Sequence, residues 1–199
     1  MTDFIDIVHF NDLAACDPQD VCRRSGSRFD EKSGRYQLTV WGEDYAIDPG
    51  RCQIDCLSVG AQPPHDYFYL FMVNYLLSAQ AMEIAGEWIS EKDLPGGPAF
   101  FRGPHAIPTG AIADCLEADR RLFGERCRQR GGTEMEMADA AYGFTIAPRI
   151  PVAVLCWEGD EDFPAEAKIL YDKTIVHHLA LDAVFALAVG ICHTLGQPF

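Results

Sequence analysis

The chain has 199 residues, 48% of them hydrophobic and 11% aromatic, so it can bury a sizeable core, and we expect one globular domain over residues 1–199. Its 16 basic residues face 30 acidic ones, which gives a formal net charge of −14 at pH 7. Such a surface repels phosphate backbones and anionic lipids, so neither nucleic acid nor a membrane is an expected partner. A protein partner would instead carry a basic surface.

The N-terminal sequence favours the cytoplasm, and the cysteines lack the spacing of a metal site. Asp3 and Asp6 stand where a secretory signal has a basic start, and no apolar stretch reaches the roughly 18 residues that span a bilayer. The 8 cysteines contain no CxxC pair, so the spacing of zinc ribbons and ferredoxin-type clusters is absent. We expect mostly structural, reduced thiols, with a metal or cluster gathered from distant cysteines as the alternative.

The first part of the chain predicts a short helix and a meander of strands. The helix covers residues 11–26, with Asp17 as its N-cap and Pro18 at its first position. Two alternating runs in residues 35–50 predict a hairpin, and residues 51–59 predict a third strand.

The middle of the chain predicts a core helix followed by an irregular segment. Residues 67–83 are apolar nearly all round, which indicates a helix covered on most sides, and Asp66 can cap it. Trp88 and Ile89 suggest a brief strand. Residues 95–108 are dense in glycine and proline, so we expect no regular structure there.

The last part of the chain alternates helices and strands. Residues 109–130 predict an amphipathic helix with a basic face, and residues 182–195 predict a final helix. Strands are expected at residues 141–147 and 150–157, with a short one at 169–171. Together these elements predict an α+β fold in which clustered, largely antiparallel strands pack on four or more helices.

Three stretches carry a resemblance to a known family: GEWISEKDLPGGPAFFRGPH, APRIPVAVLCWEGDEDFPAEAKILYD and HHLALD. Through them the chain resembles the domain-of-unknown-function 3786 family of mostly anaerobic bacteria and archaea, over residues 14–195. The family name supplies no established activity. Because some relatives join this domain to an iron-sulfur segment similar to that of corrinoid proteins, the resemblance implies anaerobic redox or one-carbon metabolism. This chain has no such segment.

The first candidate site is an acidic turn after the strand at residues 150–157. Mixed carboxylates and imidazoles suit Fe, Mn or Zn, which makes a metal-dependent enzyme one hypothesis. The alternative is a solvated turn in which Asp162 caps a helix that begins at Pro164. The candidate metal ligands are Asp160, Asp162, Asp172, His177 and His178.

The second candidate site is the loop around Phe101, Arg102 and His105. Arginine grips carboxylates through paired hydrogen bonds, histidine can ligate iron, and aromatic rings provide an apolar wall. For haem or a corrinoid, Arg102 would pair with a propionate and His105 would be the axial ligand, in a pocket that includes Trp157. Alternatively, Arg102 pairs with Asp160 or the neighbouring acids and holds two loops together.

The sequence therefore favours a cofactor- or small-ligand-binding protein over a metal-dependent enzyme or an acidic protein-interaction module. The chain contains no GxSxG, P-loop, Rossmann glycine fingerprint or HExxH motif. Whether it catalyses a reaction is left open by the sequence.

Overall fold

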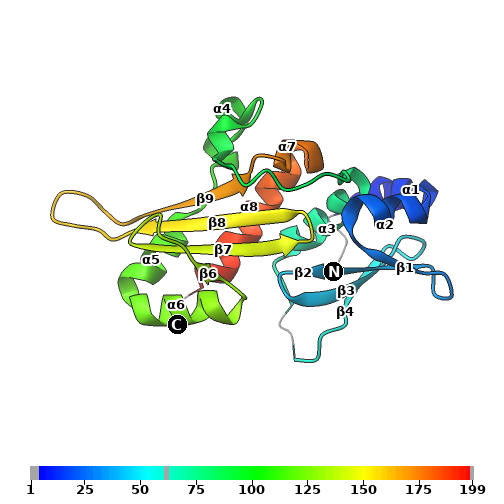
Figure 1. Ribbon diagram of the computed structural model, residues 1–199, viewed down its shortest axis with the longest axis horizontal. Coiled ribbons are helices and arrows are strands. Elements are labelled where there is room, and N and C mark those ends of the chain that lie inside the picture. The colour runs from blue at the N-terminus through cyan, green and yellow to red at the C-terminus, as the bar shows by residue number, and fades with distance from the viewer. Residues whose placement is uncertain (1–4, 61–62, 198–199) are drawn as a thin grey trace.

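The computed structural model describes residues 5–60 and 63–197, and it confirms the α+β fold, with two antiparallel sheets packed on helices (Figure 1). Within these ranges, no helix combines the length and apolar character needed to cross a bilayer. In chain order the elements are α1 (Ile7–Ala15), α2 (Pro18–Ser25), β1 (Arg28–Asp30), β2 (Arg35–Val40), β3 (Glu43–Asp48), β4 (Gln53–Cys56), α3 (Asp66–Ser78), β5 (Trp88–Ile89), the 3-10 turn η1 (Glu91–Asp93), α4 (Gly97–Phe100), the 3-10 turn η2 (Gly103–His105), α5 (Gly110–Ala118), α6 (Arg120–Gln129), β6 (Thr133–Glu134), β7 (Ala140–Ala147), β8 (Ile150–Trp157), β9 (Glu166–Asp172), α7 (Ile175–His178) and α8 (Leu181–Leu195).

The smaller sheet has the strand order β1-β2-β3-β4, which confirms the predicted meander. Its central hairpin turns through Trp41 and Gly42, whose φ angles are 49° and 81°. Two positive φ angles are typical of the tight turn whose twist matches that of paired strands. Glycine adopts this conformation freely, whereas a bulky tryptophan is strained in it.

The larger sheet has the order β5-β9-β8-β7-β6, with β8 at its centre. Val152 and Val154 point to the inner face and are fully buried in the main core, which α5 and α8 help to close. Leu155 points to the outer face, where it packs with Trp88 and Trp157. Because both faces of β8 are covered, its sequence is a continuous apolar run rather than an alternating one.

Helix α3 begins where the sequence predicted but ends earlier. Its N-cap is His65 rather than Asp66, since Nδ1 of His65 accepts a hydrogen bond from the Tyr67 N–H at 3.2 Å. The helix stops at Ser78 instead of continuing to residue 83, because Ala79 turns into an extended conformation with φ −52° and ψ 145°. Figure 1 shows α3 beside α8, behind the larger sheet.

Two predicted helices are each interrupted by an aspartate-capped break. The segment 11–26 forms α1 and α2, and Asp17 caps the second of them, as predicted. The segment 109–130 forms α5 and α6, separated at Asp119, whose carboxylate accepts from the Leu122 N–H at 2.9 Å. A short polar side chain that bonds to nearby backbone favours a new helix start over helix continuation.

Two loop predictions are corrected. No helix begins at Pro164, because residues 158–165 form the connection of the β8–β9 hairpin, in which Trp157 pairs with Glu166. The segment 95–108 is not wholly irregular, since it contains α4 and η2.

Candidate functional site

The predicted cofactor loop packs on the last helix. The Phe100 ring stacks on His105, with centroids 4.5 Å apart at an interplanar angle of 18°. The His105 ring meets Phe185 of α8 edge-on at 5.4 Å, and Phe101 is half-buried against the core. Arg102 is exposed, and its Nε donates to a backbone carbonyl of its own loop at 3.0 Å. The loop is therefore held by ring contacts, with its arginine turned to solvent.

Trp157 lies elsewhere, on the outer face of the larger sheet. The ammonium group of Lys168 lies 5.3 Å from the centroid of its ring. Helix α8 lies behind the larger sheet, on its inner face, and α4 of the loop that packs on it stands above β9 (Figure 1). The structure therefore does not bring Trp157 together with Arg102 and His105.

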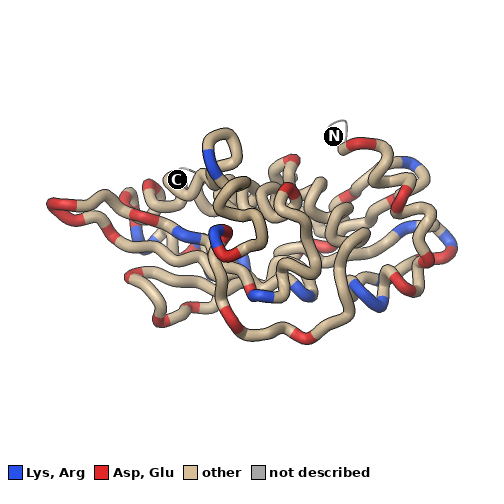
Figure 2. Tube along the Cα trace, turned by 90° about the horizontal axis from the view of Figure 1, so that it is seen from above, with Lys and Arg blue, Asp and Glu red and all other residues tan. Residues whose placement is uncertain are grey.

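The acidic turn forms the tip of the β8–β9 hairpin. This tip projects at the left end of the molecule, where its acidic residues are red in Figure 2, and it lies well apart from α4 in Figure 1. Oδ1 of Asp160 accepts from the N–H groups of Asp162 and Phe163 at 2.9 and 2.8 Å, which closes the tip on itself. Among the described residues, no ion pair or hydrogen bond joins Arg102 to Asp160 or Asp162.

Asp172 is buried and hydrogen-bonded away from that tip. Its carboxylate accepts from the N–H groups of Ala85 and Gly86 at 3.1 and 2.7 Å, and from the N–H and hydroxyl of Thr174 at 3.0 and 2.6 Å. Burial would raise the pKa of Asp172, but the hydrogen bonds from Thr174, Ala85 and Gly86 outweigh it and lower the pKa. The carboxylate thus fastens the chain between α3 and β5.

The two neighbouring histidines of α7 have different surroundings. His177 is exposed, whereas His178 is 1% exposed and its Nδ1 accepts from the Gln80 N–H at 3.1 Å. Within residues 5–60 and 63–197, no three or more His, Cys, Asp or Glu side chains are placed to share a metal ion. The structure therefore does not bring Asp160, Asp162, Asp172 and the histidines together.

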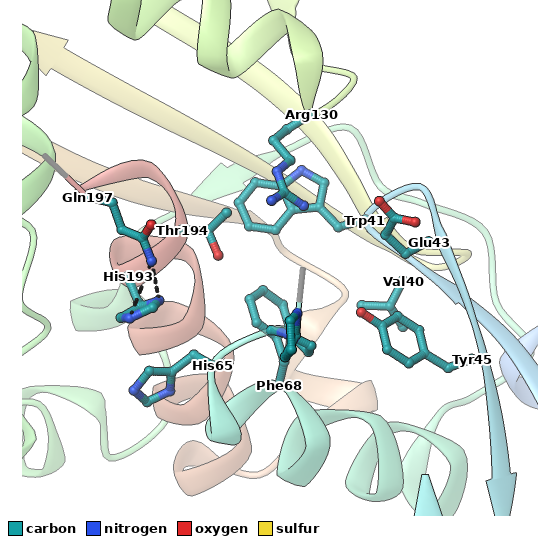
Figure 3. A pocket seen from close by; sticks show the side chains of 12 residues that line it. Val40, Trp41, Glu43, Tyr45, His65, Phe68, Arg130, His193, Thr194 and Gln197 are labelled. Carbon is teal, nitrogen blue, oxygen red and sulfur yellow. Dashed lines mark hydrogen bonds between the residues drawn. The ribbon is translucent and has the colours of Figure 1, made fainter. Parts of the chain in front are cut away.

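A different site lies where the two sheets meet the ends of α3, α6 and α8 (Figure 3). We call it the junction cavity. The space that it offers to the centres of water molecules is about 50 Å³. Its walls combine aromatic rings with side chains of both charges: Val40, Trp41, Glu43, Tyr45, Pro63, Pro64, His65, Phe68, Arg130, His193, Thr194 and Gln197.

Trp41 is the most unusual of these residues. Its side chain is buried, at 6% exposure, yet no acceptor among the described residues is within hydrogen-bond distance of its indole Nε1–H. A buried donor without a partner costs about 1–3 kcal/mol, and the positive φ of Trp41 adds strain. Figure 3 shows the indole amid the lining side chains, with Arg130 reaching toward it and Phe68 below.

Arg130 and Glu43 bring opposite charges to the junction cavity. Neither side chain forms an ion pair or a hydrogen bond with another described residue. Both also line an open groove that continues from the cavity past Gly131 and Thr145. A guanidinium carries five donors and no acceptor, so Arg130 is free to meet an anion.

A pair of histidines closes the other end of the junction cavity. The rings of His65 and His193 are 4.7 Å apart and tilted by 52°. Burial, followed by repulsion from a charged His193, lowers the pKa of His65. Because Nδ1 of His65 accepts from the backbone, the proton of its neutral ring sits on Nε2, which is then a donor.

Most of the chain matches a known protein family. The family model described as "Domain of unknown function (DUF3786)" matches residues 17–194. The chain belongs to the DUF3786 family. The resemblance stated from the sequence is therefore confirmed. No curated protein and no solved structure matches this DUF3786 chain.

The sequence of this DUF3786 chain contains one signal for the junction cavity. A Trp-Gly pair joins the two strands of the β2–β3 hairpin, where asparagine or aspartate before glycine is the usual choice. A tryptophan in that position is costly, which points to a use for its side chain. His65, Arg130 and His193 carry no such signal, because they stand far apart in the sequence.

Proposed function

We propose that this DUF3786 protein is a cytoplasmic binding protein for a small carboxylate or another small anion, held in the junction cavity. The observation that carries the proposal is the buried indole N–H of Trp41, which lines the cavity without an acceptor. A bound oxygen atom would remove the cost of that unmet donor. The 8 cysteines are all free thiols, which agrees with a reducing compartment.

Several hydrogen-bond donors line the junction cavity. Trp41 and Arg130 offer only N–H groups, and the neutral His65 ring offers its Nε2–H. The hydroxyl of Thr194 already donates to a helix carbonyl at 2.9 Å. Charge-assisted hydrogen bonds to an anion are roughly twice as strong as neutral ones, so a carboxylate suits this set better than a neutral ligand.

The size of the junction cavity limits the ligand. About 15 Å³ of such space holds one water molecule, so about 50 Å³ accommodates a group of three or four non-hydrogen atoms. A carboxylate head has that size, while haem and corrinoids are far too large for the junction cavity. Those cofactors, a bound metal and a basic protein partner stay predictions from the sequence.

The proposal can be tested through the indole N–H signals of ¹⁵N-labelled protein. The chain has 3 tryptophans, so Trp88 and Trp157 serve as internal references. Titration with acetate, propionate or inorganic phosphate, at constant ionic strength, should shift the Trp41 signal in a saturable way and leave the other two in place. Trp41→Phe assigns the signal. No saturable shift with any of these anions would contradict the proposal.

Arg130→Gln should weaken the binding of these anions by about tenfold or more, since it removes a charge-assisted hydrogen bond. Arg102→Gln is the matched control, because Arg102 is an exposed arginine outside the junction cavity whose side chain donates a hydrogen bond to its own loop. Equal losses in both variants would indicate a nonspecific effect of net charge.

A further inference from the structure

Arg130 and Glu43 line both the junction cavity and the open groove beside it, yet they do not pair with each other. On a protein of net charge −14, an arginine and a glutamate on one small rim would be expected to form an ion pair if nothing else were to be bound there. Within the described residues, each is left without any ionic partner. The rim thus presents separated positive and negative groups to whatever enters.

From this separation we infer that the ligand is a small amino carboxylate, such as an α-amino acid, whose carboxylate meets Arg130 and Trp41 while its ammonium group meets Glu43. This inference rests on the proposed function and names its ligand class. A zwitterion with adjacent charges of opposite sign complements a rim with the same two charges, whereas a plain carboxylate leaves Glu43 unmatched.

The arrangement of the side chains supports this orientation. Figure 3 shows His65 and His193 at one end of the junction cavity and Glu43 at the other, with the Trp41 indole and Arg130 between them. The donor-rich middle suits the carboxylate head. The ammonium group then lies toward Glu43, at the boundary with the open groove.

Aromatic rings add a second attraction for the ammonium group. Tyr45 and Phe68 line the junction cavity on the side of the hairpin and of α3. A cation within about 6 Å of an aromatic centroid gains roughly 0.5–2 kcal/mol, and the gain is larger where water is excluded. These rings therefore favour an ammonium group over a neutral substituent at the same position.

The open groove explains how a ligand larger than the junction cavity could be held. Because the cavity itself takes only a carboxylate head, the remainder of the molecule must leave through the opening shared by Trp41, Glu43 and Arg130. The groove continues past Gln129, Gly131 and Thr145, which are polar or small. An amino acid would therefore place its side chain in this groove.

The inference is tested with pairs of ligands that differ only in the amino group. L-alanine is compared with propionate, and L-serine with 3-hydroxypropionate, by following the Trp41 indole signal and by calorimetry. Each amino acid should bind about tenfold more tightly than its partner acid, since a charge-assisted hydrogen bond to Glu43 is added. Glu43→Gln should remove this advantage, so that each amino acid and its partner acid bind with similar affinity.

The outcomes separate this inference from the proposed function. If propionate and L-alanine bind equally and both depend on Arg130, the anion site stands and the amino carboxylate is wrong. If Glu43→Gln changes both affinities by the same factor, Glu43 acts only by repelling anions and the inference is again wrong. If neither ligand shifts the Trp41 signal, the proposed function fails as well. Glu134→Gln is the control, because Glu134 is an exposed acid paired with Arg128 outside the cavity.

Discussion

The backbone N–H of Trp41 donates to the carbonyl oxygen of Ile146 at 2.8 Å, so the tight turn of the smaller sheet is tied to β7 of the larger one. The indole meets Phe144 of β7 edge-on at 5.3 Å and lies 5.7 Å from Phe68 of α3. These contacts hold the strained turn in place, and they keep the buried indole in the wall of the cavity where the three elements meet.

Trp41→Phe should separate the structural role of the ring from the role of its N–H. The phenyl ring keeps the contacts with Phe68 and Phe144, and the variant loses a buried donor that has no partner, so the free energy of unfolding should fall by less than about 1 kcal/mol or rise slightly. Anion binding by Trp41→Phe should still weaken, because the indole N–H is lost.

Trp41→Ala, by contrast, should cost about 3–5 kcal/mol of stability. Urea denaturation and anion titration measure the two effects; a Trp41→Phe variant that binds normally would exclude the indole N–H as a ligand group.

Asp172→Asn should destabilise the protein by about 3 kcal/mol without any metal being involved. The amide cannot accept from Ala85, Gly86 and Thr174 as a charged carboxylate does, and the site is buried. Asp160→Asn is the matched control at the exposed hairpin tip and should change the stability by less than about 0.5 kcal/mol. Urea denaturation of both variants, with metal content measured before and after, checks this expectation. A loss of bound metal in Asp172→Asn would revive the predicted metal site.

The stability of the protein should decline as the pH falls from about 6.5 toward 4. Burial, reinforced by the charges of Arg149 and His177, lowers the pKa of His178 to about 4, while the unfolded chain protonates near the ordinary value of 6.5. The unfolded state therefore takes up a proton first, so the stabilisation from neutral His178 is complete above pH 6.5 and is lost as the pH approaches 4.

Urea denaturation between pH 7.5 and 4 measures this decline. His178→Gln should flatten the curve, although a residual slope should remain, because the pKa of His65 is also lowered. His177→Gln, on the exposed side of the same helix, should keep most of the slope, because burial is the largest cause of the lowered pKa of His178 and the charge of His177 is a smaller one. An unchanged slope in His178→Gln would show that another group is responsible.

Gly190→Ala should disturb the junction cavity from the far side of Phe68. A methyl group at Gly190 would lie 2.5 Å from Cδ2 of Phe68, so the ring must move toward the cavity that it lines. Overpacking of this kind costs typically about 1–3 kcal/mol. Gly110→Ala is the control, because nothing lies within 4 Å of the added methyl group. If Gly190→Ala kept the stability and the anion affinity of the wild type, this expectation would be wrong, because α3 and α8 would have moved apart without a cost in free energy.

Much of the fold could be predicted because the relevant signals are local. The apolar run of β8, the Asp17-Pro18 helix start and the hairpin within residues 35–50 depend on neighbouring residues, and each appears in the structure, although the hairpin turns at Trp41 and Gly42 rather than at the predicted Gly42-Glu43-Asp44. The end of α3 could not be predicted in this way. It depends on a hydrogen bond between Gln80 and His178, which are 98 residues apart.

The same contrast between local signals and long-range contacts holds for the candidate site. From composition, periodicity and motif, the amino-acid sequence was enough to specify an α+β chain, its central buried strand and its DUF3786 family. Those signals arise within short segments, so they survive without knowledge of the fold. The junction cavity has no such signal, because it joins the hairpin residue Trp41, the helix start at His65 and the helix ends at Arg130 and His193. Only the tertiary structure brings these groups together. It also places Asp172 apart from the predicted metal ligands and Trp157 apart from Arg102 and His105.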